Sequence, residues 1–195
     1  MAYTPSFNPP INISEVPSVP WKNGGGSTKE IAAFPPNAGI DDFIWRVSVA
    51  EIKQSSAYSL FPGVDRTQVL IAGVSLSLQS QIGLYQELLA FQPFSFAGEQ
   101  DWFAEPEGVC QMLNVMTSRA DALSILELTH GAFECVGDGH QRVLMVLQGE
   151  YLSEDDSQVY KRGDFMKLDM ALGEVFTLSA SADAVIISIQ FSLLS

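Results

Sequence analysis

The chain contains 195 residues, of which 47% are hydrophobic and 17% charged, and its formal net charge at pH 7 is −13. This composition predicts a packed globular protein with enough residues for one substantial core or for two small fused barrels. The acidic charge argues against a nucleic-acid partner and against an anionic membrane surface, because binding to either requires a basic footprint.

The first 20 residues carry five prolines and are predicted to form an extended lead-in to the body of the protein. They contain neither the basic region nor the apolar run of a secretory signal. No later window approaches the roughly 20 consecutive apolar residues that a membrane-spanning helix needs. We therefore expect a cytoplasmic protein without a membrane segment.

The stretch WKNGGGSTKE, residues 21–30, has the glycines, the lysine and the hydroxyl groups of a phosphate-binding loop. A Walker loop, however, places its lysine before the hydroxyl residue and continues into a helix. Here Lys29 follows the hydroxyl residues, and Pro35 and Pro36 leave room for one helical turn at most. A nucleotide site is therefore not expected.

Two interpretations of these glycines stay open. They form an ordinary turn before a first strand at Thr28–Phe34, or they form a turn that aims Lys22 and Asn23 at a common point. The second interpretation would place an ammonium and an amide group beside the ring of Trp21, as a ligand site requires.

Short apolar segments separated by Gly, Pro, Asn and Asp make up most of the remaining chain. In Phe43–Ala50 the residues alternate, which predicts a strand with Trp45 on one face and Arg46 on the other. The segment Leu84–Ala90 fits a helical turn or a strand. Further strands are predicted at Val74–Leu78, Val143–Leu147 and Ala184–Leu194. Many short strands with frequent turn signals predict an all-β sandwich or barrel.

Disulfide and metal chemistry is not expected. Cys110 and Cys135 lie in apolar, strand-like surroundings and are predicted to be buried free thiols. His130 and His140 have no partner at metal-ligand spacing. The sequence therefore predicts neither a metal ion nor another cofactor.

Arginine is rare in this acidic chain, which has five arginines in all. Arg46, Arg66 and Arg119 each lie in a segment of distinctive composition. Each of them is either a surface ion pair, which contributes little to stability, or part of an anion site.

Four segments bring these residues together: WKNGGGSTKEIAAFP, WRVSVAEI, YSLFPGVDRTQVLIAG and LNVMTSR. In their order and spacing, the chain resembles the HutD/Ves family of small bacterial proteins over most of its length, and only faintly beyond residue 130. The resemblance implies a cupin-type double-stranded β-helix, with two such barrels packed together as one compact unit at residues 21–195. It also implies a cytoplasmic protein without an established enzymatic activity.

The resemblance further implies a ligand. Relatives encoded beside histidine-degradation enzymes are thought to bind a small acidic metabolite such as formylglutamate, while others are linked to stress. The family's pocket pattern falls on Trp21, Asn23, Gly24, Gly25, Thr28, Glu30, Arg46, Ser48, Phe61, Asp65, Arg66, Asn114, Met116 and Arg119. The family usually has an aspartate and an aromatic residue before the asparagine of the last segment, where this chain has Gln111, Met112 and Leu113. The missing carboxylate would change which ligand is accepted.

Many cupins hold a metal through an HxH pair, which this chain lacks, so recognition of charge is expected to come from side chains. Arg46 shares a strand face with Ser48, and if that face lines the barrel, Trp45 points outward. In an empty pocket Glu30 or Asp65 would neutralise Arg46, and a bound anion would share that role. The three distinctive arginines are expected to converge at the open end of the barrel.

Binding of a small carboxylate, with no metal, is thus the favoured function. The first alternative is a metal-independent isomerase or hydrolase in which Glu30 and Asp65 form an acid/base pair. The second is a protein-interaction module, which a large exposed apolar patch would indicate. For the oligomeric state, a homodimer is one of the alternatives that the sequence leaves open.

Overall fold

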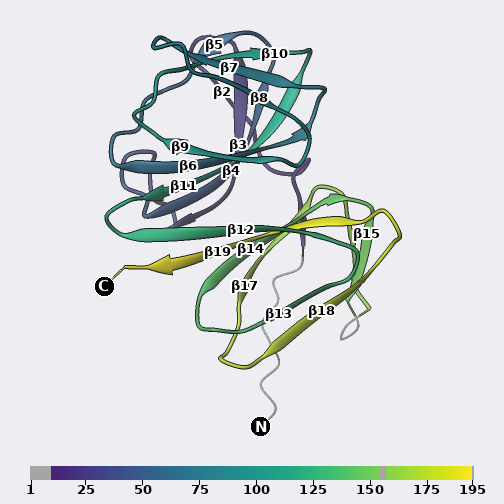
Figure 1. The fold of residues 1–195 in the computed structure, drawn as a ribbon. Coiled ribbons are helices and arrows are strands. Elements are labelled where there is room, and N and C mark those ends of the chain that lie inside the picture. Colours follow the sequence, from purple (N-terminus) through teal and green to yellow (C-terminus); the bar gives the residue numbers. More distant parts are fainter. Residues whose placement is uncertain (1–9, 154–156, 195) are drawn as a thin grey trace. The chain divides into compact units, whose positions relative to one another are not determined.

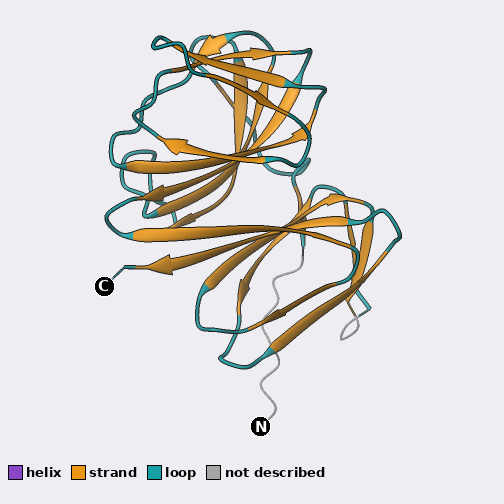
Figure 2. Cartoon of the chain, viewed as in Figure 1, coloured by secondary structure: helices purple, strands orange, loops and turns teal. Residues whose placement is uncertain are grey.

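The computed structural model describes residues 10–153 and 157–194, and all regular secondary structure in these ranges is strand (Figure 2). The all-β class predicted from the turn density is therefore confirmed. Within the same ranges, no helix has the length and apolar character needed to cross a membrane. The chain divides into two compact units. One runs from Pro17 to Leu123 and includes Leu194, and the other combines Ser124–Leu193 with residues up to Val16.

The N-terminal segment expected as a lead-in contributes a short strand to each unit. Strand β1 (Ile11–Asn12) pairs with β17 (Asp164–Asp169), whereas β2 (Val19–Pro20) pairs with β3 (Gly26–Phe34). The boundary between the units lies after Val16, between these two strands.

The Pro17–Leu123 unit consists of two antiparallel sheets that form two layers (Figure 1). The six-stranded sheet has the order β2-β3-β4-β11-β6-β9, and the four-stranded sheet has the order β5-β10-β7-β8. The further strands of this unit are β4 (Trp45–Ile52), β5 (Ser56–Ala57), β6 (Val64–Ala72), β7 (Leu76–Ser80), β8 (Tyr85–Leu88), β9 (Pro93–Ala97), β10 (Trp102–Pro106) and β11 (Cys110–Ser118).

Buried apolar side chains from both sheets form one cluster in this unit. Leu70 and Met112 come from the six-stranded sheet, and Leu78 and Trp102 come from the four-stranded sheet. Successive side chains of a strand point to opposite faces, so the face of β11 that carries Met112 continues with Asn114. The sheet face that is apolar in the cluster thus becomes polar farther along the strands.

The other unit also has two antiparallel sheets, of the orders β1-β17-β14-β19-β12 and β13-β18-β15-β16. Its interior holds a cluster of buried apolar residues that includes Leu144, Tyr151 and Phe176. The further strands are β12 (Ala122–His130), β13 (Phe133–Val136), β14 (Gln141–Gln148), β15 (Glu150–Ser153), β16 (Val159–Lys161), β18 (Val175–Ala180) and β19 (Val185–Leu193).

The strands predicted from alternation and from apolar runs are present, with shifted ends. The predictions at Phe43–Ala50 and Ala184–Leu194 correspond to β4 and β19. The ambiguous segment Leu84–Ala90 forms strand β8, which pairs with β7. Both cysteines are free and buried, as predicted.

Candidate functional site

A cavity of about 470 Å³ lies in the Pro17–Leu123 unit. Its volume falls in the range of small-molecule sites. The predicted site residues that line it are Trp21, Asn23, Thr28, Arg46, Ser48, Phe61, Arg66, Asn114 and Met116. The structure therefore brings together side chains from all four of the segments on which the family resemblance rests.

Strand register explains why these residues meet. On the inner face of the six-stranded sheet, Asn114 of β11 lies opposite Ser48 of β4 on one side and Gln68 of β6 on the other. One step along the same face, Met116 lies between Arg46 and Arg66 in the same way. Two rows of three side chains each thus cross three neighbouring strands, and all of these side chains except Met116 are polar.

Arg66 is the central charged group of the cavity. It is 7% exposed, its Nη2 donates a hydrogen bond to Asn114 Oδ1 at 3.1 Å, and its Nε is buried without a hydrogen-bond partner. The guanidinium carbon lies 5.1, 5.4 and 5.0 Å from the ring centroids of Tyr58, Phe61 and Phe96. Burial, and to a smaller extent the nearby Arg46 cation, lower the pKa of Arg66 to about 10.

A chain of hydrogen bonds orients Arg66. The Tyr58 hydroxyl donates to Gln68 Oε1 at 3.0 Å, and Gln68 Nε2 donates to Asn114 Oδ1 at 2.6 Å. Asn114 Oδ1 therefore accepts from both Gln68 and Arg66. Burial raises the pKa of Tyr58 to about 12, so the hydroxyl keeps its proton and remains a donor at neutral pH.

The second arginine of the cavity is already paired. Arg46 Nε donates to Glu30 Oε2 at 2.7 Å, and its Nη1 donates to the Ser48 hydroxyl oxygen at 3.3 Å. Of the two carboxylates expected to neutralise Arg46, Glu30 does so. Trp45, on the opposite face of β4, is fully buried and stacks on Phe34 with the ring centroids 6.2 Å apart, as the alternation predicts.

The glycine turn supports one wall of the cavity. Trp21 Nε1 donates to Thr28 Oγ1 at 2.8 Å, and Asn23 Oδ1 accepts from the Gly25 N–H at 3.0 Å. Gly24 has a φ of +71°, a conformation that favours glycine. A Cβ at Gly26 would lie 2.2 Å from the carbonyl oxygen of Glu51 and 3.0 Å from the ring of Trp21. The glycines therefore serve local geometry, and neither Gly24 nor Gly25 lines the cavity.

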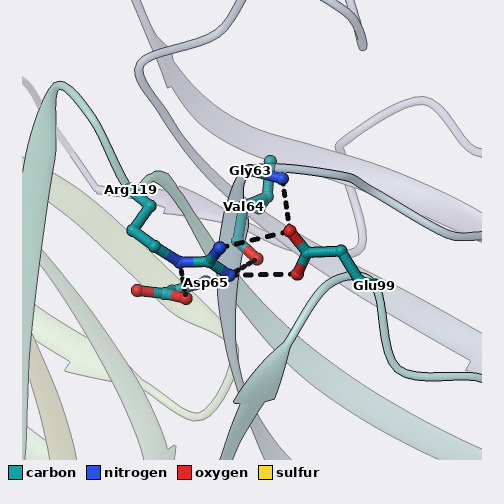
Figure 3. Close-up of polar contacts among 5 residues, drawn as sticks. All are labelled: Gly63, Val64, Asp65, Glu99 and Arg119. Atoms are coloured by element: carbon teal, nitrogen blue, oxygen red, sulfur yellow. Dashed lines mark hydrogen bonds and ion pairs between the residues drawn. The ribbon is translucent and has the colours of Figure 1, made fainter.

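The expectation that three arginines converge is wrong for Arg119. Arg119 lies outside the cavity lining, where its Nε donates to Asp65 Oδ1 at 2.8 Å and its Nη2 donates to Glu99 Oε2 at 3.0 Å (Figure 3). Asp65 precedes Arg66 on β6 and therefore points to the opposite face of the sheet. The predicted neutralisation of Arg46 by Asp65 is wrong for the same reason.

The proposed acid/base pair is not assembled either. Glu30 lies on β3 and Asp65 on β6, and β4 and β11 lie between these strands. Three inter-strand spacings place the two backbones on the order of 14 Å apart. Each carboxylate accepts a hydrogen bond from a different arginine, and neither lines the cavity. Across the described residues, no group of three His, Cys, Asp or Glu side chains could hold a metal ion.

Tyr58 and Gln68 belong to the site but are not among the residues predicted from the sequence. Both line the cavity, and both belong to the hydrogen-bond chain that orients Arg66. Gln68 lies two residues after Arg66 on the same strand, so alternation alone indicates that it shares the inner face. Tyr58 lies before β6 with no periodic signal, although it opens one of the family segments.

We expect the variant Glu99→Gln to be destabilised at neutral pH but not in strong acid. Hydrogen bonds from Arg119 and from the Gly63 N–H lower the pKa of Glu99 from 4.5 to about 2. This stabilising contribution is complete above pH 4.5 and is lost as the pH falls towards 2. Urea unfolding of parent and variant, from about pH 7 to about pH 2.5, is expected to show the difference in unfolding free energy shrinking in that window.

The matched control is Glu105→Gln, which changes an exposed carboxylate on β10 of the same unit. Its unfolding free energy is expected to follow that of the parent at each pH. A difference between parent and Glu99→Gln that persists unchanged at the acid end contradicts the assignment.

Comparisons with known proteins identify a matching family model and similar proteins. The HutD family model matches residues 13–184. Protein Ves of Citrobacter koseri is 35% identical over 143 residues, which cover 72% of this chain and 73% of that protein. Protein Ves of Escherichia fergusonii is 39% identical over 109 residues, which cover 55% and 56%, respectively.

Solved structures show the same fold. HutD from Pseudomonas fluorescens SBW25 matches with a TM-score of 0.83 and 22% identity, covering 97% of this chain and 100% of that chain. A cupin 2 conserved barrel domain protein from Leptotrichia buccalis matches with a TM-score of 0.62 and 10% identity, covering 98% and 99%, respectively. The cupin-like fold expected from the sequence is confirmed, while the arrangement as two packed barrels stays a prediction.

Proposed function

Because this chain belongs to the HutD family, we propose that its cavity binds a small carboxylate metabolite without a metal ion or another cofactor. In this proposal the protein is a binding protein and not an enzyme. Ligand binding would serve the regulation of histidine utilisation or of a stress response, the two roles that the family resemblance implies.

The main support for the proposal is the environment of the buried Arg66 cation. Among the described residues it makes no salt bridge, and its contacts are to aromatic rings and to neutral oxygens of Asn114 and Ser59. A buried cation without an anion is energetically costly. A carboxylate that enters the cavity would supply the missing charge through charge-assisted hydrogen bonds.

The rest of the lining favours an anion as well. Although the whole chain has a net charge of −13, the cavity is lined by Lys22, Arg46 and Arg66, and none of the described lining residues is a carboxylate. The acceptor oxygens of Asn114 and Gln68 are already occupied by internal donors. The groups around Arg66 therefore present hydrogen-bond donors to a ligand, and not free hydrogen-bond acceptors.

Apolar side chains make up much of the remaining surface of the cavity. Trp21, Phe61 and Met116 line it together with Ile40 and Ile52. A ligand that places a carboxylate on Arg66 would bury an apolar body against these side chains, which adds about 25 cal/mol for each Å² removed from water. The structure thus supports a small acid with a compact apolar part.

Benzoate and benzamide test this proposal, because they have the same shape and only benzoate is an anion. We expect benzoate at about ten times its dissociation constant to raise the melting temperature by about 3–5 °C. Benzamide at the same concentration is expected to leave it unchanged. Equal stabilisation by both compounds, or by neither, would overturn the proposal.

A further inference from the structure

Arg119 joins three segments on the outside of the Pro17–Leu123 unit (Figure 3). Its guanidinium donates to Asp65 Oδ1 at 2.8 Å, to the two carboxylate oxygens of Glu99 at 3.1 and 3.0 Å, and to the carbonyl oxygen of Val64 at 3.4 Å. The Arg119 guanidinium thus contacts both β6 and the turn between β9 and β10. An isolated exposed ion pair contributes little, but a guanidinium with several partners fixes their geometry.

The same network holds Gly63 at both of its peptide groups. The Gly63 N–H donates to Glu99 Oε1 at 2.6 Å, and its carbonyl oxygen accepts from the backbone N–H of Arg119 at 2.8 Å. Gly63 has a φ of +76°, so the turn at this point needs a conformation that other residues rarely adopt. The turn that contains Gly63 is therefore defined by the residues around Arg119.

This turn also lies directly against Gly98. The Phe61 N–H donates to the Gly98 carbonyl oxygen at 2.8 Å, and the Gly98 N–H donates to the Val64 carbonyl oxygen at 2.7 Å. A Cβ at Gly98 would lie 2.4 Å from the carbonyl oxygen of Phe61. Glu99 directly follows Gly98. Its ion pair with Arg119 therefore helps to hold Gly98 against the turn.

Phe61 connects the turn to the cavity, because its backbone belongs to the turn and its side chain lines the cavity. Its ring lines the cavity, and the ring centroid lies 5.4 Å from the guanidinium carbon of Arg66. We propose that Arg119 is a positioning residue that sets the affinity of the cavity for a carboxylate without touching it. It does so by fixing the turn that holds Phe61 over Arg66. The inference rests on the proposed function, since it concerns the same ligand.

The position of the Phe61 ring matters because it covers one face of the Arg66 cation. An aromatic ring over a desolvated guanidinium is attracted to it and excludes water from its surface. Without Arg119 the turn would sample other conformations, and the guanidinium would be less ordered before the anion arrives. Preorganised donors bind an anion more tightly than mobile ones, because less ordering remains to be done on binding.

A double-mutant cycle with benzoate as the probe tests this chain of contacts. Its dissociation constant is measured by titration calorimetry for the parent, Arg119→Ala, Phe61→Ala and the double variant. We expect each single substitution to weaken binding about 3- to 10-fold. Because Arg119 acts through Phe61, the double variant is expected to bind within about twofold of Phe61→Ala alone.

The matched control is Lys53→Ala, which removes another exposed ion pair of the same unit, with Glu51 at 2.9 Å. It is expected to leave the benzoate affinity unchanged. If Arg119→Ala fails to fold, Glu99→Gln removes the charge partner with a smaller perturbation and is expected to weaken binding in the same direction. An Arg119→Ala variant that binds like the parent, or effects that add in the double variant, would overturn the inference. A parent that does not distinguish benzoate from benzamide would instead overturn the proposed function.

Discussion

The variant Arg66→Met is expected to lose anion binding and, without ligand, to be more stable than the parent. Charge-assisted hydrogen bonds of the guanidinium contribute about 1.5–3 kcal/mol each, so the affinity for benzoate should fall by about 30-fold or more. Methionine matches the arginine side chain as far as Nε, is apolar and packs favourably against aromatic rings such as those of Tyr58, Phe61 and Phe96. Removing a buried cation that no carboxylate neutralises should therefore raise the free energy of unfolding by about 1–3 kcal/mol.

The two results are measured separately, by titration calorimetry with benzoate and by urea unfolding without it. Arg46→Met is the matched control for stability, because Arg46 is already paired with Glu30 and its removal relieves no uncompensated charge. We expect no gain in stability from this variant. An Arg66→Met protein that still binds benzoate like the parent would contradict the assignment of Arg66 as the anion ligand.

The variant Gly26→Ala is expected to be destabilised by about 2–3 kcal/mol. An added Cβ would lie 2.2 Å from the Glu51 carbonyl oxygen and 3.0 Å from the Trp21 ring, so the start of β3 or the ring must move. The unfolding free energy measured with urea checks the magnitude. Because Trp21 lines the cavity, we also expect weaker binding of benzoate.

The neighbouring substitution Gly25→Ala separates this local effect from a general intolerance of the glycine turn. A Cβ at Gly25 would lie 3.3 Å from Asn23 Oδ1 and 3.5 Å from the side chain of Ser56, so little has to move. We expect a loss of stability below about 1 kcal/mol. Equal losses at the two glycines would show that contact with Glu51 and Trp21 is not the cause.

The features that could be predicted from the sequence are those set by local periodicity. Alternation in one segment placed Arg46 and Ser48 on one strand face and Trp45 on the other, and the structure confirms this arrangement. The density of turn residues is also local information. It predicted the all-β class, because frequent turns limit each strand to a few residues.

The features that could not be predicted depend on pairing between distant strands. Asn114 meets Gln68 because β11 and β6 pair in one register, which includes an irregularity at Gln111 and Met112 that no local pattern indicates. Arg119 follows the end of β11, where alternation no longer determines the direction of a side chain. The importance of Gly26 was missed because its close neighbour, Glu51, is distant in sequence.

Asp65 and Arg66 are adjacent in sequence yet belong to separate systems, one to the outer ion cluster and one to the cavity. Since the side chains of β6 alternate, inserting or deleting one residue before this pair within the strand would exchange them, placing a carboxylate in the cavity and a guanidinium in solvent. A change of one residue in the length of this strand would therefore reverse the charge that β6 presents to the cavity.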